Sequence, residues 1–148
     1  MPMKSALFEA QCEHCRYSFS QPHLSNFNYV DFLFTGEKGT VYGYFYAIDN
    51  PVWNYVDSLF SIYGNSAKSR EGVGAILQTA CAYLADPIEG QRLRNRSVCP
   101  ICQSARIKIV EENCVGLLEI PSVSFSSFMS MSDSARQQLV LDFFASYG

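Results

Sequence analysis

Cys12-Glu13-His14-Cys15 and Cys99-Pro100-Ile101-Cys102 are two Cys-x-x-Cys motifs that stand far apart in a chain of 148 residues. Two cysteines three positions apart on a tight turn direct both sulfur atoms towards one metal ion, about 2.3 Å away in the case of zinc. One motif is half of a tetrahedral site. Together the motifs supply four thiolates, so the sequence predicts that Cys12, Cys15, Cys99 and Cys102 bind one Zn2+ ion and fasten distant parts of the chain.

Strand-like sequences surround both motifs. Residues 6–11 lead directly into the first motif, Tyr17 and Phe19 alternate with polar residues after it, and residues 106–110 alternate after the second motif. A proline follows Cys99 directly. In these stretches the chain resembles the zinc-ribbon group, in which two Cys-x-x-Cys knuckles on two hairpins hold one zinc ion.

The resemblance extends over Leu7 to Phe19 and Val98 to Val110, and it implies a zinc ribbon with a large insertion between its knuckles. In that group a glycine often follows the second cysteine of each knuckle. This chain has Arg16 and Gln103 at those positions. The turn after each knuckle is therefore the place where the chain departs from the group.

Reduced thiols without a metal are the main alternative for the four cysteines. A second alternative is disulfide exchange by Cys12 and Cys15, which requires the motif to open a helix that lowers the pKa of a thiol. Pro22 and the strand-like flanks disfavour such a helix. The remaining cysteines, Cys81 in a predicted helix and Cys114 in a predicted strand, are expected to be buried core residues.

The two histidines of the chain lie close to the first motif. His14 stands between the two cysteines and is expected to face solvent, away from the metal that they share. His23 is expected to bind the metal only in place of a cysteine. Four thiolates leave no coordination position for water, and no nucleophile is accompanied by a base elsewhere, so we expect a structural site and no enzyme.

Length and charge limit the class of protein. With 148 residues and 48% hydrophobic content, the chain can bury a core of its own, which favours one domain. A net charge of −3 disfavours a surface that follows a phosphate backbone and favours protein partners. The first residues have too short an apolar run for a signal peptide, and no run is long enough to span a membrane. We therefore expect a cytoplasmic protein with no membrane association.

Two hairpins are expected besides the first knuckle. Residues 29–35 and 40–48 are rich in aromatic and β-branched side chains and are separated by two glycines, which predicts an antiparallel pair. Residues 106–110 and 114–120 predict a second pair. In this interpretation Glu111 and Glu112 belong to a solvated hairpin tip.

Three helices are expected. Asn50-Pro51 combines an N-cap residue with proline at the first helical position, and apolar residues recur at steps of three and four, which predicts a helix over 51–63. The same periodicity predicts a helix over 70–85. After a serine-rich tract expected to form an irregular strand, loop or linker, Ser132 or Ser134 is expected to cap a final helix that ends at 147.

The fold class that results is α+β in a single domain, residues 1–148. Zinc-ribbon-like antiparallel strands come from residues 5–20 and 97–120. An inserted body, residues 24–95, carries a β-hairpin and two helices, and a C-terminal helix covers residues 132–147.

Two surfaces are candidate binding sites. Tyr42, Tyr44 and Tyr46 alternate along a predicted strand, and tyrosine is favoured at protein interfaces because it combines apolar area with a polar tip. The alternative is that helices cover this row. A group of basic residues surrounds the second knuckle and predicts either a solubilising face or a nucleic-acid contact. The group comprises Arg92, Arg94, Arg96, Arg106 and Lys108.

These features together favour a non-enzymatic, zinc-stabilised module that binds a protein partner. In size, acidity and tyrosine content the chain is similar to small bacterial inhibitor or immunity proteins, which neutralise a basic toxin by covering it. Acidic surface would speed the capture of such a partner. The alternative is a nucleic-acid-associated zinc ribbon that acts through the basic residues around the second knuckle.

Overall fold

The computed structural model describes residues 3–24, 30–63 and 73–147. Antiparallel strands and helices are both present, which confirms the predicted α+β class. The chain divides into two compact units. A strand unit contains Met1–Tyr46 and Pro87–Val123, and a helix unit contains Ala47–Asp86 and Ser124–Gly148. The predicted inserted body is thereby divided, because its hairpin belongs to the strand unit and its helices to the helix unit.

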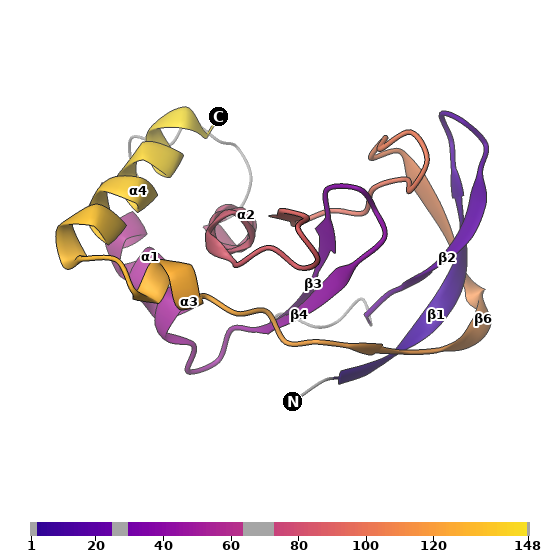
Figure 1. Cartoon of the computed structure of the whole chain (residues 1–148), viewed down its shortest axis with the longest axis horizontal. Coiled ribbons are helices and arrows are strands. Elements are labelled where there is room, and N and C mark those ends of the chain that lie inside the picture. Colours follow the sequence, from indigo (N-terminus) through magenta and orange to yellow (C-terminus); the bar gives the residue numbers. More distant parts are fainter. Residues whose placement is uncertain (1–2, 25–29, 64–72, 148) are drawn as a thin grey trace. The chain divides into compact units, whose positions relative to one another are not determined.

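The first sheet of the strand unit has β1 (Met3–Cys12) between β2 (Ser18–Pro22) and β6 (Ile107–Ile120), and both neighbours are antiparallel to it (Figure 1). Along the second half of β1 buried and exposed residues alternate, with Ala10 and Cys12 buried. This is the pattern expected of a strand with one face on a core. The strand pair that flanks the first motif is thereby confirmed.

The predicted second hairpin is wrong. Residues 107–120 form the single strand β6, and both of its halves pair with β1 instead of with each other. The register shifts between Leu7, Phe8 and Glu9 of β1, which face Gly116, Cys114 and Val110 of β6, so residues 111–113 form a bulge. Those residues include no glycine for a tight turn, and β1 is long enough to pair with both halves.

The second sheet contains β3 (Asp31–Gly36) between β4 (Tyr42–Tyr46) and the short β5 (Leu93–Arg94). The pairing of β3 with β4 confirms the predicted hairpin, although Tyr29, its predicted first residue, lies outside the described residues. Phe34 and Phe45 are buried on one face of this sheet and stack with ring centroids 5.3 Å apart. Two backbone hydrogen bonds, from Tyr44 N to Pro121 O and from Val123 N to Tyr44 O, join β4 to the segment that follows β6.

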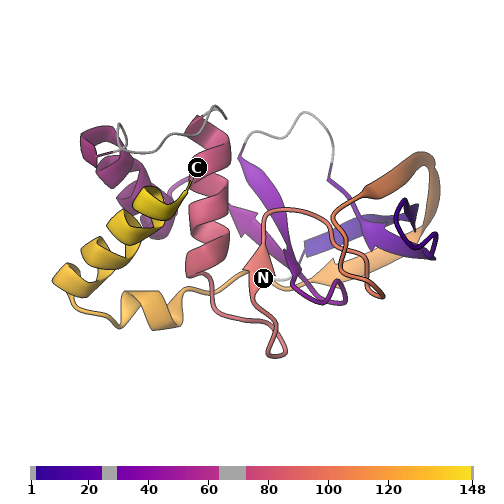
Figure 2. The ribbon, with the colours of Figure 1, turned by 90° about the horizontal axis from the view of Figure 1, so that it is seen from above.

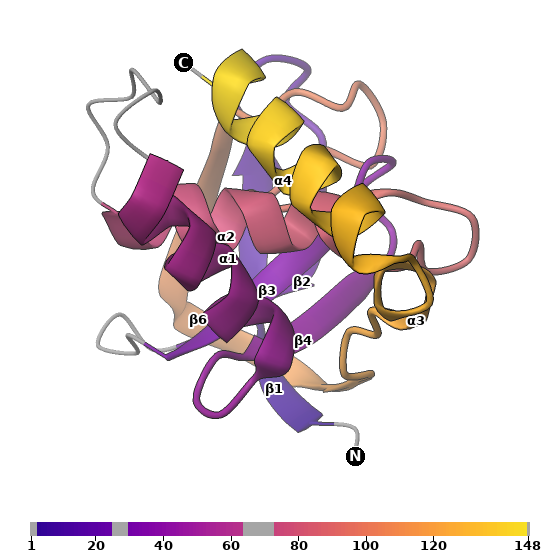
Figure 3. The ribbon, with the colours of Figure 1, turned by 90° about the vertical axis from the view of Figure 1, so that its left-hand side faces the viewer.

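The helix unit consists of α1 (Pro51–Tyr63), α2 (Val73–Leu84), the single turn α3 (Ser126–Met129) and α4 (Asp133–Ser146) (Figure 3). Helix α1 contacts both α2 and α4. None of these helices, within the residues that the structure describes, is long and apolar enough to cross a membrane.

The helix starts follow from side-chain capping. The Oδ1 atom of Asn50 accepts hydrogen bonds from the backbone N–H groups of Val52 (2.9 Å) and Trp53 (3.1 Å), as an N-cap residue should. The Oγ atom of Ser132 accepts one from Ala135 N at 3.2 Å. The predicted helices over 51–63 and 132–147 are confirmed, and so is the described part of the helix predicted over 70–85, whose first residues lie outside the described ranges.

Candidate metal centre

The first knuckle is the turn between β1 and β2. Cys12 is the last residue of β1, and its carbonyl oxygen accepts a hydrogen bond from Arg16 N at 2.9 Å. Its own N–H donates to Tyr17 O, also at 2.9 Å. Arg16 closes the turn with a positive φ of 69°. The chain thus reverses around Cys15 and leaves both cysteines on the same turn.

The second knuckle repeats this hydrogen-bond pattern in the loop before β6. Gln103 N donates to Cys99 O and Cys99 N donates to Ser104 O, both at 2.9 Å. Gln103 has a φ of 60°. Arg16 and Gln103 therefore adopt the left-handed conformation for which glycine is favoured, so the departure from the zinc-ribbon pattern changes the residue type and leaves the turn geometry intact.

Pairing of β1 with β6 brings the knuckles together. Cys12 lies opposite Ile107 in the ladder, and one step beyond it Glu13 N donates to Arg106 O at 2.8 Å. The first knuckle is thereby held beside the segment that leaves the second knuckle. The buried Gln21 adds a further tie, because its Nε2 atom donates to Ser97 Oγ at 2.9 Å.

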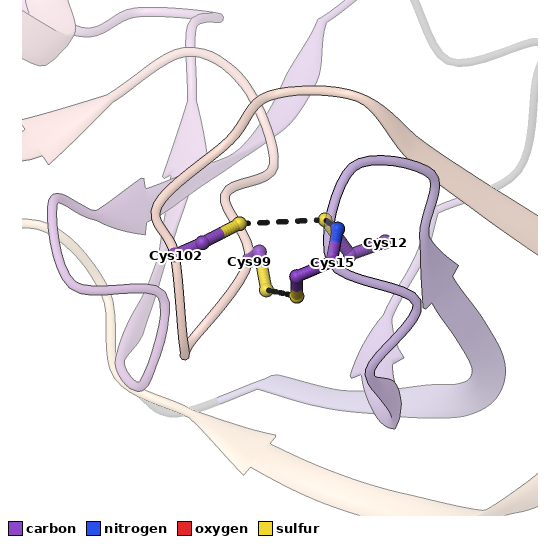
Figure 4. A group of neighbouring side chains, drawn as sticks. All are labelled: Cys12, Cys15, Cys99 and Cys102. Carbon is purple, nitrogen blue, oxygen red and sulfur yellow. Dashed lines mark hydrogen bonds between the residues drawn. The ribbon is translucent and has the colours of Figure 1, made fainter.

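The four predicted sulfur atoms converge (Figure 4). The Sγ atoms of Cys12 and Cys102 are 3.6 Å apart, those of Cys15 and Cys99 are also 3.6 Å apart, and all four lie within 4.8 Å of one another. Four sulfurs at about 2.3 Å from a tetrahedral zinc ion would be about 3.8 Å apart. The geometry therefore allows all four cysteines to bind one metal ion.

Backbone N–H groups point at two of these sulfurs. Cys15 N lies 3.4 Å from Cys12 Sγ, and Ile101 N lies 3.4 Å from Cys99 Sγ. Such bonds favour the thiolate form. At Cys12 the hydrogen bond from the Cys15 backbone is the largest influence and helps lower the pKa to about 6, although burial opposes it.

Cys15 shows the opposite shift. A hydrogen bond from the Tyr17 backbone lowers its pKa, but burial and the three neighbouring cysteine sulfurs outweigh this bond and raise the pKa to about 12. Neighbouring thiolates repel one another, so a cluster of four is not fully ionised without a compensating cation. A divalent metal ion supplies that compensation, which makes this donor set suitable for a metal.

The other sequence candidates take separate positions. His14 is exposed, as predicted, and the ring of His23 lies edge-on to that of Phe8 at 6.1 Å. Within residues 3–24, 30–63 and 73–147, the group of potential ligands contains the four cysteines and neither histidine. Residues 13–15 form a turn after a strand, so the first motif does not open the helix that disulfide exchange would require.

The predictions for the remaining cysteines divide. Cys81 is fully buried in α2, as predicted, and burial raises the pKa of its thiol. Cys114 is exposed, so its predicted burial is wrong. It lies beside the bulge on β6, which is an edge strand, and the bulge interrupts the alternation that would have placed it on a core face.

The tyrosine row occupies the face of β4 opposite its buried residues. Tyr42, Tyr44 and Tyr46 face Thr35, Leu33 and Asp31 of β3, while Gly43 and Phe45 are buried. Tyr44 donates from its hydroxyl to Asp31 Oδ2 at 3.0 Å, and burial together with this carboxylate raises its pKa to about 12. Tyr46 is 46% exposed.

The basic residues are distributed over both sheets. Arg92, Arg94 and Arg96 are exposed and alternate with less exposed residues along and beside β5, whereas Lys108 lies on β6 and Arg106 just before it. Arg92 N also donates to Glu37 Oε2 at 2.8 Å. The three arginines therefore lie together near β5. The other two basic residues lie at the start of β6, beside the first knuckle.

Comparison of the chain with protein-family models, with curated proteins and with solved structures gave no significant match. The candidate metal centre is defined by its own geometry. Two contacts that support it were not predicted. One is the hydrogen bond from Gln21 to Ser97, and the other is the close approach of Gly39 to the second knuckle, where a Cβ atom on Gly39 would lie 2.5 Å from Val98 O. The two glycines at 36 and 39 predicted a turn, but neither periodicity nor a motif indicates which distant segment of backbone that turn will contact.

Proposed function

We propose that Cys12, Cys15, Cys99 and Cys102 bind one structural Zn2+ ion. Tetrahedral sets of four thiolates are typical of zinc and of iron–sulfur sites. The separation of the sulfur atoms carries the proposal, because two pairs at 3.6 Å lie close to the spacing of a tetrahedral zinc site. Four protein ligands leave no position for water or substrate, so the ion would act as a fastener and not as a catalyst.

Elemental analysis of the purified protein tests this proposal. We expect one zinc per chain in the natural protein and in a Cys114→Ala variant, because Cys114 is exposed and outside the cluster. A Cys99→Ala variant is expected to lose most of its zinc affinity. Iron in place of zinc, or no metal in the natural protein, would end the proposal.

For the whole molecule we propose a non-enzymatic module that binds a protein through the tyrosine face. This face consists of the row Tyr42, Tyr44 and Tyr46 together with Asp31 and Leu33 opposite it. Antiparallel sheets commonly pack one face on a core and leave the other accessible. The second sheet supports that arrangement, since Phe34 and Phe45 are buried on one face while Tyr46 is exposed on the other. Tyrosine side chains at such a face provide contact area at low conformational cost.

The proposal is tested by affinity purification from the native cell with two matched baits. A Tyr46→Asp variant changes the most exposed tyrosine, and a Tyr83→Asp variant changes one of similar exposure on α2. We expect a stoichiometric protein that is retained by the second variant and lost with the first. Equal retention by both variants, or the absence of any stoichiometric protein, would contradict the tyrosine face.

Nucleic-acid binding is the second candidate, and the exposed alternation of Arg92, Arg94 and Arg96 favours it. Contacts of these arginines with phosphates would give an affinity that falls steeply with added salt. Because the chain has a net charge of −3, and because Arg106 and Lys108 lie at the other sheet, apart from these three arginines, we expect weak binding to generic DNA or RNA at physiological salt. Submicromolar, salt-sensitive binding that is lost in an Arg94→Ala, Arg96→Ala variant would replace the protein-binding proposal.

A further inference from the structure

The turn between β3 and β4 lies against the backbone of the second knuckle (Figure 2). A Cβ atom on Gly39 would lie 2.5 Å from the carbonyl oxygen of Val98 and 3.0 Å from backbone atoms of Cys99 and Pro100. Gly39 also has a φ of 76°, and it is buried. Two features therefore favour glycine at this position: the positive φ, and the close approach to the backbone of residues 98–100, which includes the proposed ligand Cys99.

Hydrogen bonds hold this turn, residues 36–40, in one conformation. The buried Gln91 accepts from Lys38 N through its Oε1 atom (3.0 Å) and donates from Nε2 to Thr40 Oγ1 (2.7 Å). Gly39 N donates to Gly36 O at 2.8 Å, and Glu37 N donates to Arg92 O at 2.8 Å. These hydrogen bonds fix the backbone of the turn. A displacement of the second knuckle would therefore move the turn as a whole instead of changing its internal conformation.

The same turn contacts the tyrosine face. The carbonyl oxygen of Gly39 accepts a hydrogen bond of 3.4 Å from the hydroxyl group of Tyr42. Tyr42 is the first residue of β4 and is half-buried, and this burial raises the pKa of its hydroxyl group. One residue therefore touches the metal-ligand backbone on one side and the first tyrosine of the row on the other.

We infer that the β3–β4 turn couples metal occupancy to the tyrosine face, with Gly39 as the positioning residue between them. The inference rests on the proposed zinc site. Metal bound to Cys99 and Cys102 fixes the backbone of Val98–Pro100, which seats Gly39 and orders the start of β4. Loss of the metal frees that backbone and loosens the tyrosine row. Coupling of this kind is reciprocal, so a partner bound to the tyrosine face would tighten metal binding.

Amide hydrogen exchange of the natural chain tests the coupling without a mutation. Removal of zinc by a chelator is expected to speed exchange of the amides of Gly39 and of the β3–β4 ladder by at least about tenfold. Amides of α4, in the helix unit, serve as the control. Two results would refute the coupling while leaving the proposed zinc site intact, provided that the protein binds zinc. One is unchanged exchange in the β3–β4 hairpin after zinc removal, and the other is an equal acceleration of exchange in α4. A protein that binds no zinc fails at the earlier proposal.

A matched pair of glycine substitutions tests the contact itself. Gly90 has a φ of 77°, nearly that of Gly39, but a Cβ atom there would have no neighbour within 4 Å. Gly39→Ala and Gly90→Ala therefore both place an alanine at a positive φ, and only the first brings a Cβ atom into the backbone of the second knuckle. Loss of the contacts that orient metal ligands typically weakens metal binding roughly ten- to a hundredfold, and we expect a loss of this order for Gly39→Ala relative to Gly90→Ala.

Competition with a chromophoric zinc chelator measures this difference. If Gly39→Ala does not fold, Gln91→Ala loosens the turn without a collision and is expected to weaken zinc binding in the same direction. The role of the turn would be refuted if Gly39→Ala bound zinc as tightly as Gly90→Ala. The same holds for Gln91→Ala where that variant is used.

Discussion

At the scale of the residue, the candidate metal centre depends on two residues that carry side chains in a conformation that favours glycine. Arg16 and Gln103 have φ values of 69° and 60°, and each donates its N–H to the carbonyl of the first cysteine of its knuckle. The left-handed conformation costs a residue with a Cβ atom roughly 1–2 kcal/mol. Convergence of four sulfurs on one ion would offset that cost, since zinc bound to small finger peptides contributes about 10–16 kcal/mol.

Substitutions at Gln103 measure this strain. We expect Gln103→Gly to be more stable than Gln103→Ala by about 1 kcal/mol, because alanine keeps the Cβ atom while both lose the exposed hydrogen bond from Gln103 Nε2 to Pro100 O. Gln103→Val should be the least stable, since a β-branched side chain tolerates positive φ poorly. Urea unfolding of the zinc-loaded proteins gives the order, and an alanine variant as stable as the glycine variant would show that the turn carries no strain.

At the scale of the element, local chemistry explains which predictions succeeded. Helix α1 begins at Pro51 because Asn50 caps it, and α4 begins after Ser132 for the same reason, so both starts were visible in the sequence. The path of β6 was not visible. Residues 106–110 and 114–120 are separated by three polar residues and suggest two strands, whereas both halves pair with the long strand β1 and form one bulged strand.

The cysteine cluster was predictable for a related reason. Spacing of three positions sets the local turn, and the requirement for four ligands then pairs the two distant motifs. The contacts that support the cluster depend on tertiary packing alone. Gln21 reaches Ser97, and Gly39 approaches Val98, across sequence separations that no local pattern specifies. The burial predicted for Cys114 failed because a bulge changed the register of the strand that carries it.

The short helix α3 depends on a side chain from another element. Asp86, just after α2, accepts hydrogen bonds from Ser126 N (2.8 Å) and Ser127 N (3.1 Å) and from Ser124 Oγ (2.7 Å). Burial raises the pKa of this carboxyl, but the hydrogen bonds from Ser124, Ser127 and Ser126 outweigh it and hold the pKa below its usual value. The carboxylate form therefore acts as a cap on the first turn of α3.

Replacement of Asp86 by asparagine should reveal a pH-dependent stability. We expect Asp86→Asn to lower the free energy of unfolding by about 1 kcal/mol at pH 7, because both carboxylate oxygens accept hydrogen bonds and the asparagine NH2 group cannot replace one of them. The folded pKa is depressed, so the stabilisation is complete above the unfolded pKa of about 4 and is lost as the pH falls through the folded value. Asp57→Asn on the exposed surface of α1 is the charge-matched control. A difference between the natural protein and Asp86→Asn that persists unchanged at pH 2 would contradict the cap.

At the scale of the whole molecule, a zinc ion would close a long loop of the chain. Cys15 and Cys99 are 84 positions apart, and the residues between them include α1 and α2 of the helix unit. By the chain-entropy relation for cross-links, closing a loop of that length is worth on the order of 4–5 kcal/mol. Both cysteine pairs nevertheless belong to the strand unit, so the native contacts that a bound metal would support lie in that unit.

This difference between the units predicts how zinc removal changes unfolding. Trp53 is the single tryptophan and lies in α1, so its fluorescence reports on the helix unit, while the amide signals of Phe8 and Ala10 in β1 report on the strand unit. We expect a chelator to lower the urea midpoint of the β1 signals far more than that of Trp53, because each unit is compact and only one contains the ligands. Cys99→Ser without chelator should reproduce the effect, and Cys114→Ser should not. Equal shifts of both probes would mean that the units unfold as one cooperative structure, in which the zinc site supports the helices as strongly as the strands.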